Sequence, residues 1–191
     1  MRTEDLKIFS NIPTIRTERL VLRKITPADL IDVYEYSKNP ETSKFLLWSK
    51  HNSLNDTKIL LSIIKRKYKE NAFYEWGIEY NGKMIGTAGF THFSIANDSA
   101  EIGYVINPDY QGIGIATEAA RAVIDFGFNT LNLNRIEARC MKGNDKSIRV
   151  MEKCGMKVEG TMRSLIYAKG NYVDVVIAAI IGNEYANWDK R

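Results

Sequence analysis

The chain has 191 residues, of which 45% are hydrophobic and 26% are charged, and its net charge at pH 7 is +4. This composition predicts one globular domain, and it excludes the domain-wide basic surface that nucleic-acid-binding proteins use. The longest aliphatic run, residues 175–181, is far shorter than the roughly 20 residues that span a bilayer. Residues 1–13 contain no apolar signal-peptide core, so we expect a cytoplasmic protein without membrane contact.

The first half of the chain predicts a strand followed by helices. Residues 17–25 alternate between apolar and charged side chains, as a half-buried strand does. Thr26 and Pro27 supply an N-cap and a first helical position for a helix over 27–37. Pro40 opens a short helical turn, and Ser53 or Asn55 caps a third helix. The apolar stripe of that helix is Ile59, Leu60, Ile63, Ile64 and Tyr68.

The second half predicts six further strands around two helices. The Asn81-Gly82 pair is a strong hairpin signal between the first two of these strands. A helix opens after Gly114 and runs to about Leu131, and a second, capped helix covers residues 144–155. The six strands are expected at 73–80, 83–90, 99–106, 135–141, 157–168 and 172–181. This order is typical of an α+β domain and is too irregular for a doubly wound βαβ array.

The two cysteines, Cys140 and Cys154, lie inside regular apolar patterns. No Cys-x-x-Cys pair or metal-ligand cluster accompanies them. We therefore expect two reduced core thiols and no metal.

Gly112 and Gly114 directly precede the helix that follows the strand at 99–106. A dinucleotide-binding GxGxxG would need glycine where Thr117 stands, and the Gly-Lys-Ser/Thr of a P-loop is absent. The first N–H groups of a helix lack intrahelical acceptors, and glycines let an anion approach the backbone closely. The pair is therefore either a tight strand-to-helix turn or a cradle for phosphates.

Residues 101–119, "EIGYVINPDYQGIGIATEA", followed by residues 135–163, "RIEARCMKGNDKSIRVMEKCGMKVEGTMR", resemble the GCN5-related N-acetyltransferase (GNAT) superfamily. The likeness is greatest to the branch of the ribosomal-protein alanine N-acetyltransferases, RimJ and RimL. Residues 17–23 and 170–180 match that branch as well, so the resemblance covers about residues 15–185 of a single domain spanning 1–191. It implies a mixed, mostly antiparallel central sheet of about seven strands flanked by helices.

The resemblance implies acetyl-CoA as the donor, with its pyrophosphate over the main-chain amides of Gln111, Gly112, Ile113, Gly114, Ile115, Ala116 and Thr117. Its pantetheine arm would pair with the strand of Tyr104, Val105 and Ile106, where Val105 or Ile106 would polarise the acetyl carbonyl. In the family the asparagine at position 144 also reaches the cofactor, although an N-cap role explains Asn144 equally well. Asp109 departs from the Gln or Arg of the family pattern, so no phosphate contact is assigned to its side chain.

Acetyl transfer to an amine requires a route for the amine proton and a proton for the departing thiolate. Glu101 is the candidate base, because alternation puts it on one face with Gly103 and Val105, although a solvated strand-end carboxylate would look the same. Ser147 is the candidate acid, with Tyr104, Tyr110 and Tyr167 as rivals. Glu118 falls in the first helical turn, where the helix dipole alone accounts for it.

Four basic residues recur at helical spacing: Lys142, Lys146, Arg149 and Lys153. They form either a solvated helix face or a contact with the 3′-phosphate of CoA. The acceptor site should be bordered by residues 45–53, with Trp48, and by the last hairpin, with Tyr167 and Tyr172, although Trp48 is equally compatible with a core role.

An α-amine is about one-tenth neutral at pH 7, whereas only a few parts in roughly ten thousand of a lysine are. A protein or peptide N-terminus, of the ribosomal-protein-alanine type, is therefore the expected acceptor of this acyltransferase. Two alternatives remain, a small-molecule amine (a polyamine, aminoglycoside or amino-acid analogue) and a non-catalytic acyl-CoA-binding module. A homodimer, common in the resembled family, is carried as an expectation.

Overall fold

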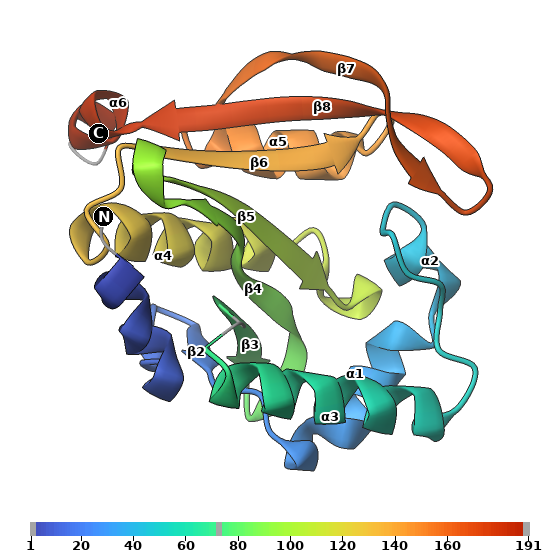
Figure 1. The fold of residues 1–191 in the computed structure, drawn as a ribbon. Helices are drawn as coiled ribbons and strands as arrows, with labels where there is room; N and C mark the ends of the chain where they lie inside the picture. The colour runs from blue at the N-terminus through green and yellow to red at the C-terminus, as the bar shows by residue number, and fades with distance from the viewer. Residues whose placement is uncertain (1–2, 72–73, 189–191) are drawn as a thin grey trace.

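The computed structural model describes residues 3–71 and 74–188 (Figure 1). Within these ranges, eight strands form one sheet in the order β1-β2-β3-β4-β5-β6-β8-β7. All neighbouring strands are antiparallel except β5 and β6. The strands are β1 (Ile15–Arg16), β2 (Leu20–Arg23), β3 (Tyr74–Tyr80), β4 (Lys83–Ser94), β5 (Ser99–Ile106), β6 (Arg135–Met141), β7 (Lys157–Ala168) and β8 (Asn171–Ile181).

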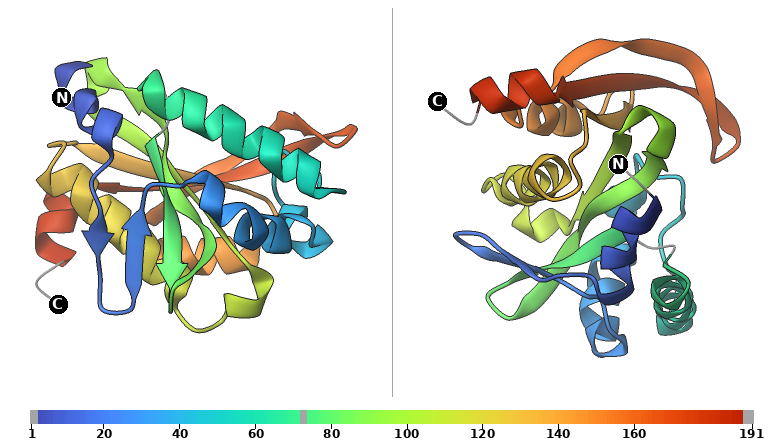
Figure 2. Two further views of the ribbon diagram at one scale, coloured as in Figure 1. Left: turned by 90° about the horizontal axis from the view of Figure 1, so that it is seen from below. Right: turned by 60° about the vertical axis from the view of Figure 1, so that its left-hand side comes forward.

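Helices cover both faces of this sheet (Figures 1 and 2). Helices α4 and α5 lie together against one face, and α1 and α3 lie against the other. The α-helices are α1 (Leu30–Ser37), α2 (Pro40–Ser43), α3 (Leu54–Lys69), α4 (Ile115–Asn129), α5 (Asp145–Lys153) and α6 (Gly182–Trp188). Short 3₁₀ helices are Thr3–Asn11, Pro27–Asp29, Ile95–Asn97 and Pro108–Tyr110. No described helix is both long and apolar enough to cross a bilayer.

The expected α+β architecture is confirmed, with eight strands rather than about seven. The additional strand is β1, whose two residues pair with β2 and are too few to show alternation. The expected strand at 17–25 shortens to β2, because Thr17 forms a turn with Leu20. The helix expected from Pro27 begins at Leu30, after one 3₁₀ turn.

The core reaches further toward the N-terminus than the expected limit near residue 15. Phe9 is fully buried and lies between the sheet and α4. Its ring makes edge contacts with Trp76 at 5.6 Å and with Phe126 at 6.0 Å. Edge-to-face pairs of this kind add to the burial energy of aromatic side chains, so the first 3₁₀ helix is part of the packed domain.

Glu75 on β3 is a carboxyl group within the layer between the sheet and helices α1 and α3. Burial raises its pKa to about 7, although a hydrogen bond with Thr87 and the charge of Lys67 oppose that rise. The folded state therefore keeps a proton that the unfolded chain, with a pKa near 4.5, releases. Stability is then highest below the unfolded pKa and is lost as the pH rises toward the folded one.

We expect the free energy of unfolding to fall by up to about 3 kcal/mol between pH 4.5 and pH 7 on account of Glu75. Glu75→Gln removes this contribution, so the variant should gain stability over the wild type as the pH rises. Urea unfolding of both proteins at pH 5, 6, 7 and 8 measures the difference. Two stability curves that run parallel through this range would contradict the assignment.

Candidate active site

Strands β5 and β6 pair only along their first halves. The parallel register joins Ser99–Ile102 to Arg135–Ala138, after which the two strands diverge (Figure 1). Strand β5 continues to Ile106 beside β4, and β6 continues to Met141 beside β8. In the described part of the chain, the edge of β5 from Gly103 to Ile106 therefore has no partner strand on the β6 side.

The backbone groups that face this opening can be assigned by alternation along β5. The Asn107 N–H donates to the Ile85 oxygen at 2.7 Å, so it points to β4. The Val105 carbonyl also points to β4, since a Cβ on Gly86 would lie 2.0 Å from its oxygen. Successive backbone groups of a strand point to opposite edges. The backbone N–H and C=O groups of Tyr104 and Ile106 therefore point toward the opening. Of the two candidates for polarising the acetyl carbonyl, the geometry favours the Ile106 N–H over the Val105 N–H.

The loop between β5 and α4 has the backbone of an anion cradle. Gly112 and Gly114 have φ values of +83° and +86°, which only glycine adopts without strain. Helix α4 begins at Ile115, so the amides of its first turn lack intrahelical acceptors and carry the positive end of the dipole. The Gln111 N–H already donates to the Pro108 oxygen. The free amides therefore begin after Gln111, whereas the family resemblance had included the amide of Gln111.

Arg19 and Glu118 hold this loop in place through side-chain hydrogen bonds. Glu118 accepts hydrogen bonds from the Thr17 hydroxyl at 2.6 Å and from the Arg19 Nε at 2.7 Å. The Arg19 Nη1 donates to the Ile113 oxygen at 2.8 Å. The expected structural role of Glu118 thus has a partner across the fold, and Arg19 is a loop-holding residue that the sequence did not indicate.

Three side chains meet on the α5 side of the opening. The Tyr104 and Ser147 hydroxyl oxygens are 2.9 Å apart, and the Tyr104 hydroxyl lies 3.1 Å from the Ser147 carbonyl oxygen. Burial raises the pKa of the nearby Cys140 thiol, against the opposing influence of the Ser147 hydroxyl. Burial raises the pKa of Tyr104, so its phenol stays protonated. The structure brings together two sequence candidates and one cysteine that was expected only to fill the core.

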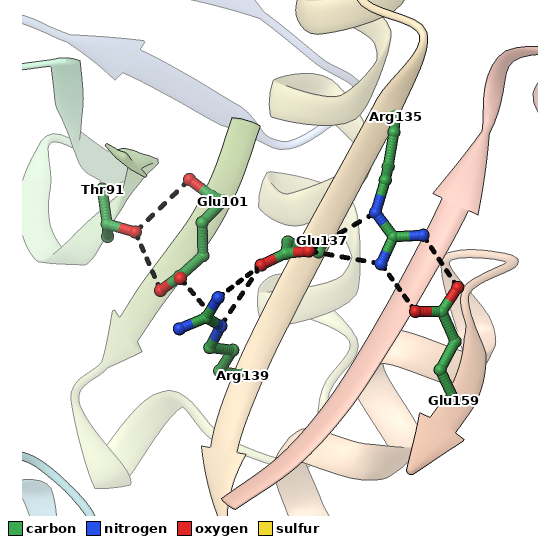
Figure 3. A network of polar contacts seen from close by, with 6 residues as sticks. All are labelled: Thr91, Glu101, Arg135, Glu137, Arg139 and Glu159. Carbon is green, nitrogen blue, oxygen red and sulfur yellow. Dashed lines mark hydrogen bonds and ion pairs between the residues drawn. The ribbon is translucent and has the colours of Figure 1, made fainter. Parts of the chain in front are cut away.

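Glu101 points to the opposite face of the sheet, within a chain of charges (Figure 3). Its carboxylate accepts a hydrogen bond from Thr91 at 3.1 Å and pairs with the Arg139 Nε at 3.1 Å. Arg139 also binds Glu137, and Arg135 joins Glu137 to Glu159. Glu101 lies one residue before β5 and β6 diverge, so it borders the opening from the face that Ser147 does not occupy.

Asn144 caps helix α5, as its sequence position predicted, with its Oδ1 accepting the Ser147 N–H at 3.3 Å. The four basic residues do not share one helix face, because Lys142 precedes α5 and pairs with Asp174 at 3.3 Å. Lys146 donates to the Gln111 Oε1 at 2.9 Å and so lies next to the glycine loop.

The residues expected at the acceptor site come from the β7–β8 hairpin and from the segment before α3. Tyr167 and Tyr172 face each other across the β7–β8 hairpin at 5.1 Å, and both are exposed. The same hairpin reaches α2 through a hydrogen bond from Lys169 to the Ser43 oxygen. Trp48 is half-buried and lies 5.8 Å from the His51 ring. The aromatic pair and Trp48 have different ring partners, and no ring contact joins them among the described residues.

The sequence and the fold are similar to those of known acetyltransferases. The acetyltransferase (GNAT) domain family matches residues 19–157. An uncharacterized N-acetyltransferase p20 of Bacillus licheniformis is 33% identical over 91% of this chain and 98% of its own. A GNAT-family acetyltransferase of Bacillus anthracis superposes with a TM-score of 0.79 at 30% identity, covering 90% of this chain and 99% of the other.

Relatives with named acceptors fall into two groups. A putative ribosomal N-acetyltransferase YdaF of Bacillus subtilis is 30% identical over 88% of this chain and 94% of its own. A spermidine N(1)-acetyltransferase of Escherichia coli is 26% identical over 86% of this chain and 87% of its own. RimL, a ribosomal L7/L12 α-N-protein acetyltransferase solved with CoA, shares the fold, with a TM-score of 0.78 at 23% identity over 88% of this chain and 98% of its own.

Proposed function

The chain belongs to the GNAT acetyltransferase family and is an N-acetyltransferase, and from this premise we propose that it acetylates an N-terminal α-amine. The acceptor is the N-terminus of a protein or peptide in the cytoplasm, of the ribosomal-protein-alanine type. Acetyl-CoA supplies the acetyl group as an activated thioester. The observation that carries the proposed acetyl transfer is the pair of hydroxyls, Tyr104 and Ser147, beside the opening between β5 and β6.

The glycine loop fits a pyrophosphate. A Cβ on Gly112 would meet nothing within 4 Å, so the backbone is open to an approaching anion. The free amides from Gly112 to Thr117 are the donors, and the dipole of α4 adds positive potential. Lys146, held beside the loop by Gln111, and Asn144 complete the cofactor side.

The opening supports the transfer itself. The Ile106 N–H can donate to the thioester carbonyl and stabilise negative charge that develops on its oxygen. On one face, Ser147 can give its proton to the departing thiolate, with Tyr104 orienting the hydroxyl. On the other face, Glu101 can accept the amine proton, directly or through water. The acid and the base then lie on opposite faces of the sheet, so no proton passes directly from one to the other.

The choice of an α-amine rests on two supports. About one-tenth of an α-amine is already neutral at pH 7, which suits a site with a single base held in an ion pair. In addition, a 30% identical relative is named as a putative ribosomal N-acetyltransferase. The spermidine acetyltransferase relative favours a small-molecule amine as the second candidate.

Thiol release tests the proposal. The protein is incubated with acetyl-CoA and separate acceptors: peptides beginning with alanine or serine, the same peptides blocked at the N-terminus, free lysine, spermidine and an aminoglycoside. We expect turnover with the free peptides and none with the blocked ones. Preferred turnover of spermidine or the aminoglycoside would replace the peptide acceptor with the second candidate.

Gly114→Ala is expected to weaken CoA binding about tenfold. A left-handed backbone costs an alanine about 1–2 kcal/mol, and its Cβ would meet the Arg19 guanidinium at 3.2 Å, so the loop must shift. Gly82→Ala is the matched control, since Gly82 has φ +77° with nothing near its Cβ, in the β3–β4 turn. Calorimetric titration with CoA should show a loss for Gly114→Ala only, and an equal loss in both variants would refute the cradle.

A further inference from the structure

A polar cavity of about 590 Å³ lies beyond the end of β5 and includes residues 50–52 of the segment expected at the acceptor site. Three segments form it: the end of α1, residues 50–52 before α3, and the residues that follow Ile106. Its lining includes Lys38, Lys50, His51 and Asn107. Because Asn107 comes directly after Ile106, and a strand rises about 3.3 Å per residue, the cavity adjoins the end of the opening between β5 and β6.

Asn107 brings an unused hydrogen-bond donor to this cavity. The residue is only 2% exposed, and its Oδ1 accepts the Asp109 N–H at 3.1 Å. That bond fixes the orientation of the amide, because only the oxygen can accept from an N–H. Among the described residues, the Asn107 Nδ2 has no hydrogen-bond partner. A buried donor left unpaired is costly to a fold, so its retention beside a cavity points to a ligand oxygen.

The surrounding charges favour an electron-rich ligand. Lys38 and Lys50 line the cavity, while Glu35 is occupied by an ion pair with Lys83 at 2.7 Å. Asp109 is the carboxylate left to oppose the two lysines within the lining. The lining therefore carries a small positive excess together with the Asn107 donor.

His51 adds a further polar group to the same wall. Its Nδ1 is 2.8 Å from the Thr57 hydroxyl, which leaves the other ring nitrogen free to bond a ligand. Burial lowers the pKa of His51, against the nearby charge of Asp56, so the ring is neutral at pH 7. The positive excess therefore comes from the two lysines and not from the imidazole.

We propose that this cavity is a subsite of the acceptor, in which the Asn107 Nδ2 donates to a carbonyl or carboxylate oxygen close to the acetylated amine. The inference rests on the proposed function and sharpens it. A peptide N-terminus and a free amino acid both carry such an oxygen next to the amine. A polyamine carries none, so it gains nothing from Asn107.

Asn107→Asp keeps the acceptor for the Asp109 N–H and removes the amide donor. We expect its KM to rise about tenfold for an alanine tripeptide amide, which has carbonyls and no carboxylate, and for free alanine. The rate with spermidine and the affinity for CoA should not change. A loss confined to the tripeptide assigns the carbonyl, and a loss confined to alanine assigns the carboxylate. Asn134→Asp makes the same change at an exposed site before β6 and serves as the control.

Lys50→Gln is a second variant that leaves the buried asparagine in place, with exposed Lys65→Gln of α3 as its control. It should raise the KM for the oxygen-bearing acceptors and weaken its dependence on salt. Equal changes in KM for the tripeptide amide, alanine and spermidine, or no change for any of them in Asn107→Asp, would overturn the subsite. Turnover by the wild type would still support the proposed acetyl transfer. Should wild type acetylate none of them, calorimetry of the tripeptide with the CoA complex decides instead: binding lost in Asn107→Asp supports the subsite, and binding retained refutes it.

Discussion

Replacing Ser147 with alanine should lower kcat about 100-fold, the usual contribution of a positioned proton donor, without changing the affinity for acetyl-CoA. The hydroxyl lies beside the opening, 2.9 Å from the phenol oxygen of Tyr104, and close enough to the Cys140 thiol to affect its pKa. The CoA thiolate that leaves in this opening needs a proton, which the Ser147 hydroxyl can supply. The backbone should not move, because the Ser147 N–H bond to Asn144 does not involve the side chain. Steady-state rates and calorimetry with CoA separate the two effects.

Tyr104→Phe distinguishes the two hydroxyls. If Tyr104 only orients Ser147, its loss should cost about tenfold in kcat, and the double variant should be no slower than Ser147→Ala, as for residues that act as one unit. A full loss in Tyr104→Phe with an active Ser147→Ala would instead make the phenol the proton donor. Equal CoA affinity in all variants shows that the site is still formed.

The elements that follow local rules were predictable from the sequence. Ser53 and Asn144 cap their helices through side-chain bonds to the backbone, and Asn81-Gly82 turns the β3–β4 hairpin with both residues at positive φ. These bonds join residues within a few positions, so a short window contains the whole cause. Phe9 was missed because its burial depends on Trp76 and Phe126, far away in the chain.

The features of the candidate site also divide into those set by neighbouring residues and those set by residues far apart in the chain. The glycine loop is local, and its chemistry follows from two glycines and a helix start. The Arg19–Glu118 brace joins residues 99 positions apart, and the meeting of Tyr104 with Ser147 depends on where β5 and β6 diverge. No periodicity in either strand encodes that point. Strand β6 stays paired with β8, and β5 stays paired with β4 across a register shift between Phe90 and His92, opposite Ile102 and Glu101.

Glu101→Gln is the second change with a large expected effect, a loss of about 100-fold in kcat/KM at pH 7. The carboxylate is the candidate that takes the amine proton, and glutamine cannot take it. The deficit should shrink toward pH 9, because an α-amine with a pKa of about 7.7–8.0 is then mostly neutral without help. A pH profile of kcat/KM for the peptide acceptor measures this recovery.

Glu137→Gln is the matched control, because Glu137 and Glu101 share Arg139 (Figure 3) and are paired in register across β5 and β6. Each variant frees Arg139 from one carboxylate, so a purely structural role predicts two similar losses that do not depend on pH. If Glu101 is the base, the loss of kcat/KM should become smaller as the pH rises in Glu101→Gln but not in Glu137→Gln. The reverse pattern, with the pH-dependent loss in Glu137→Gln, would move the base to the neighbouring strand, β6.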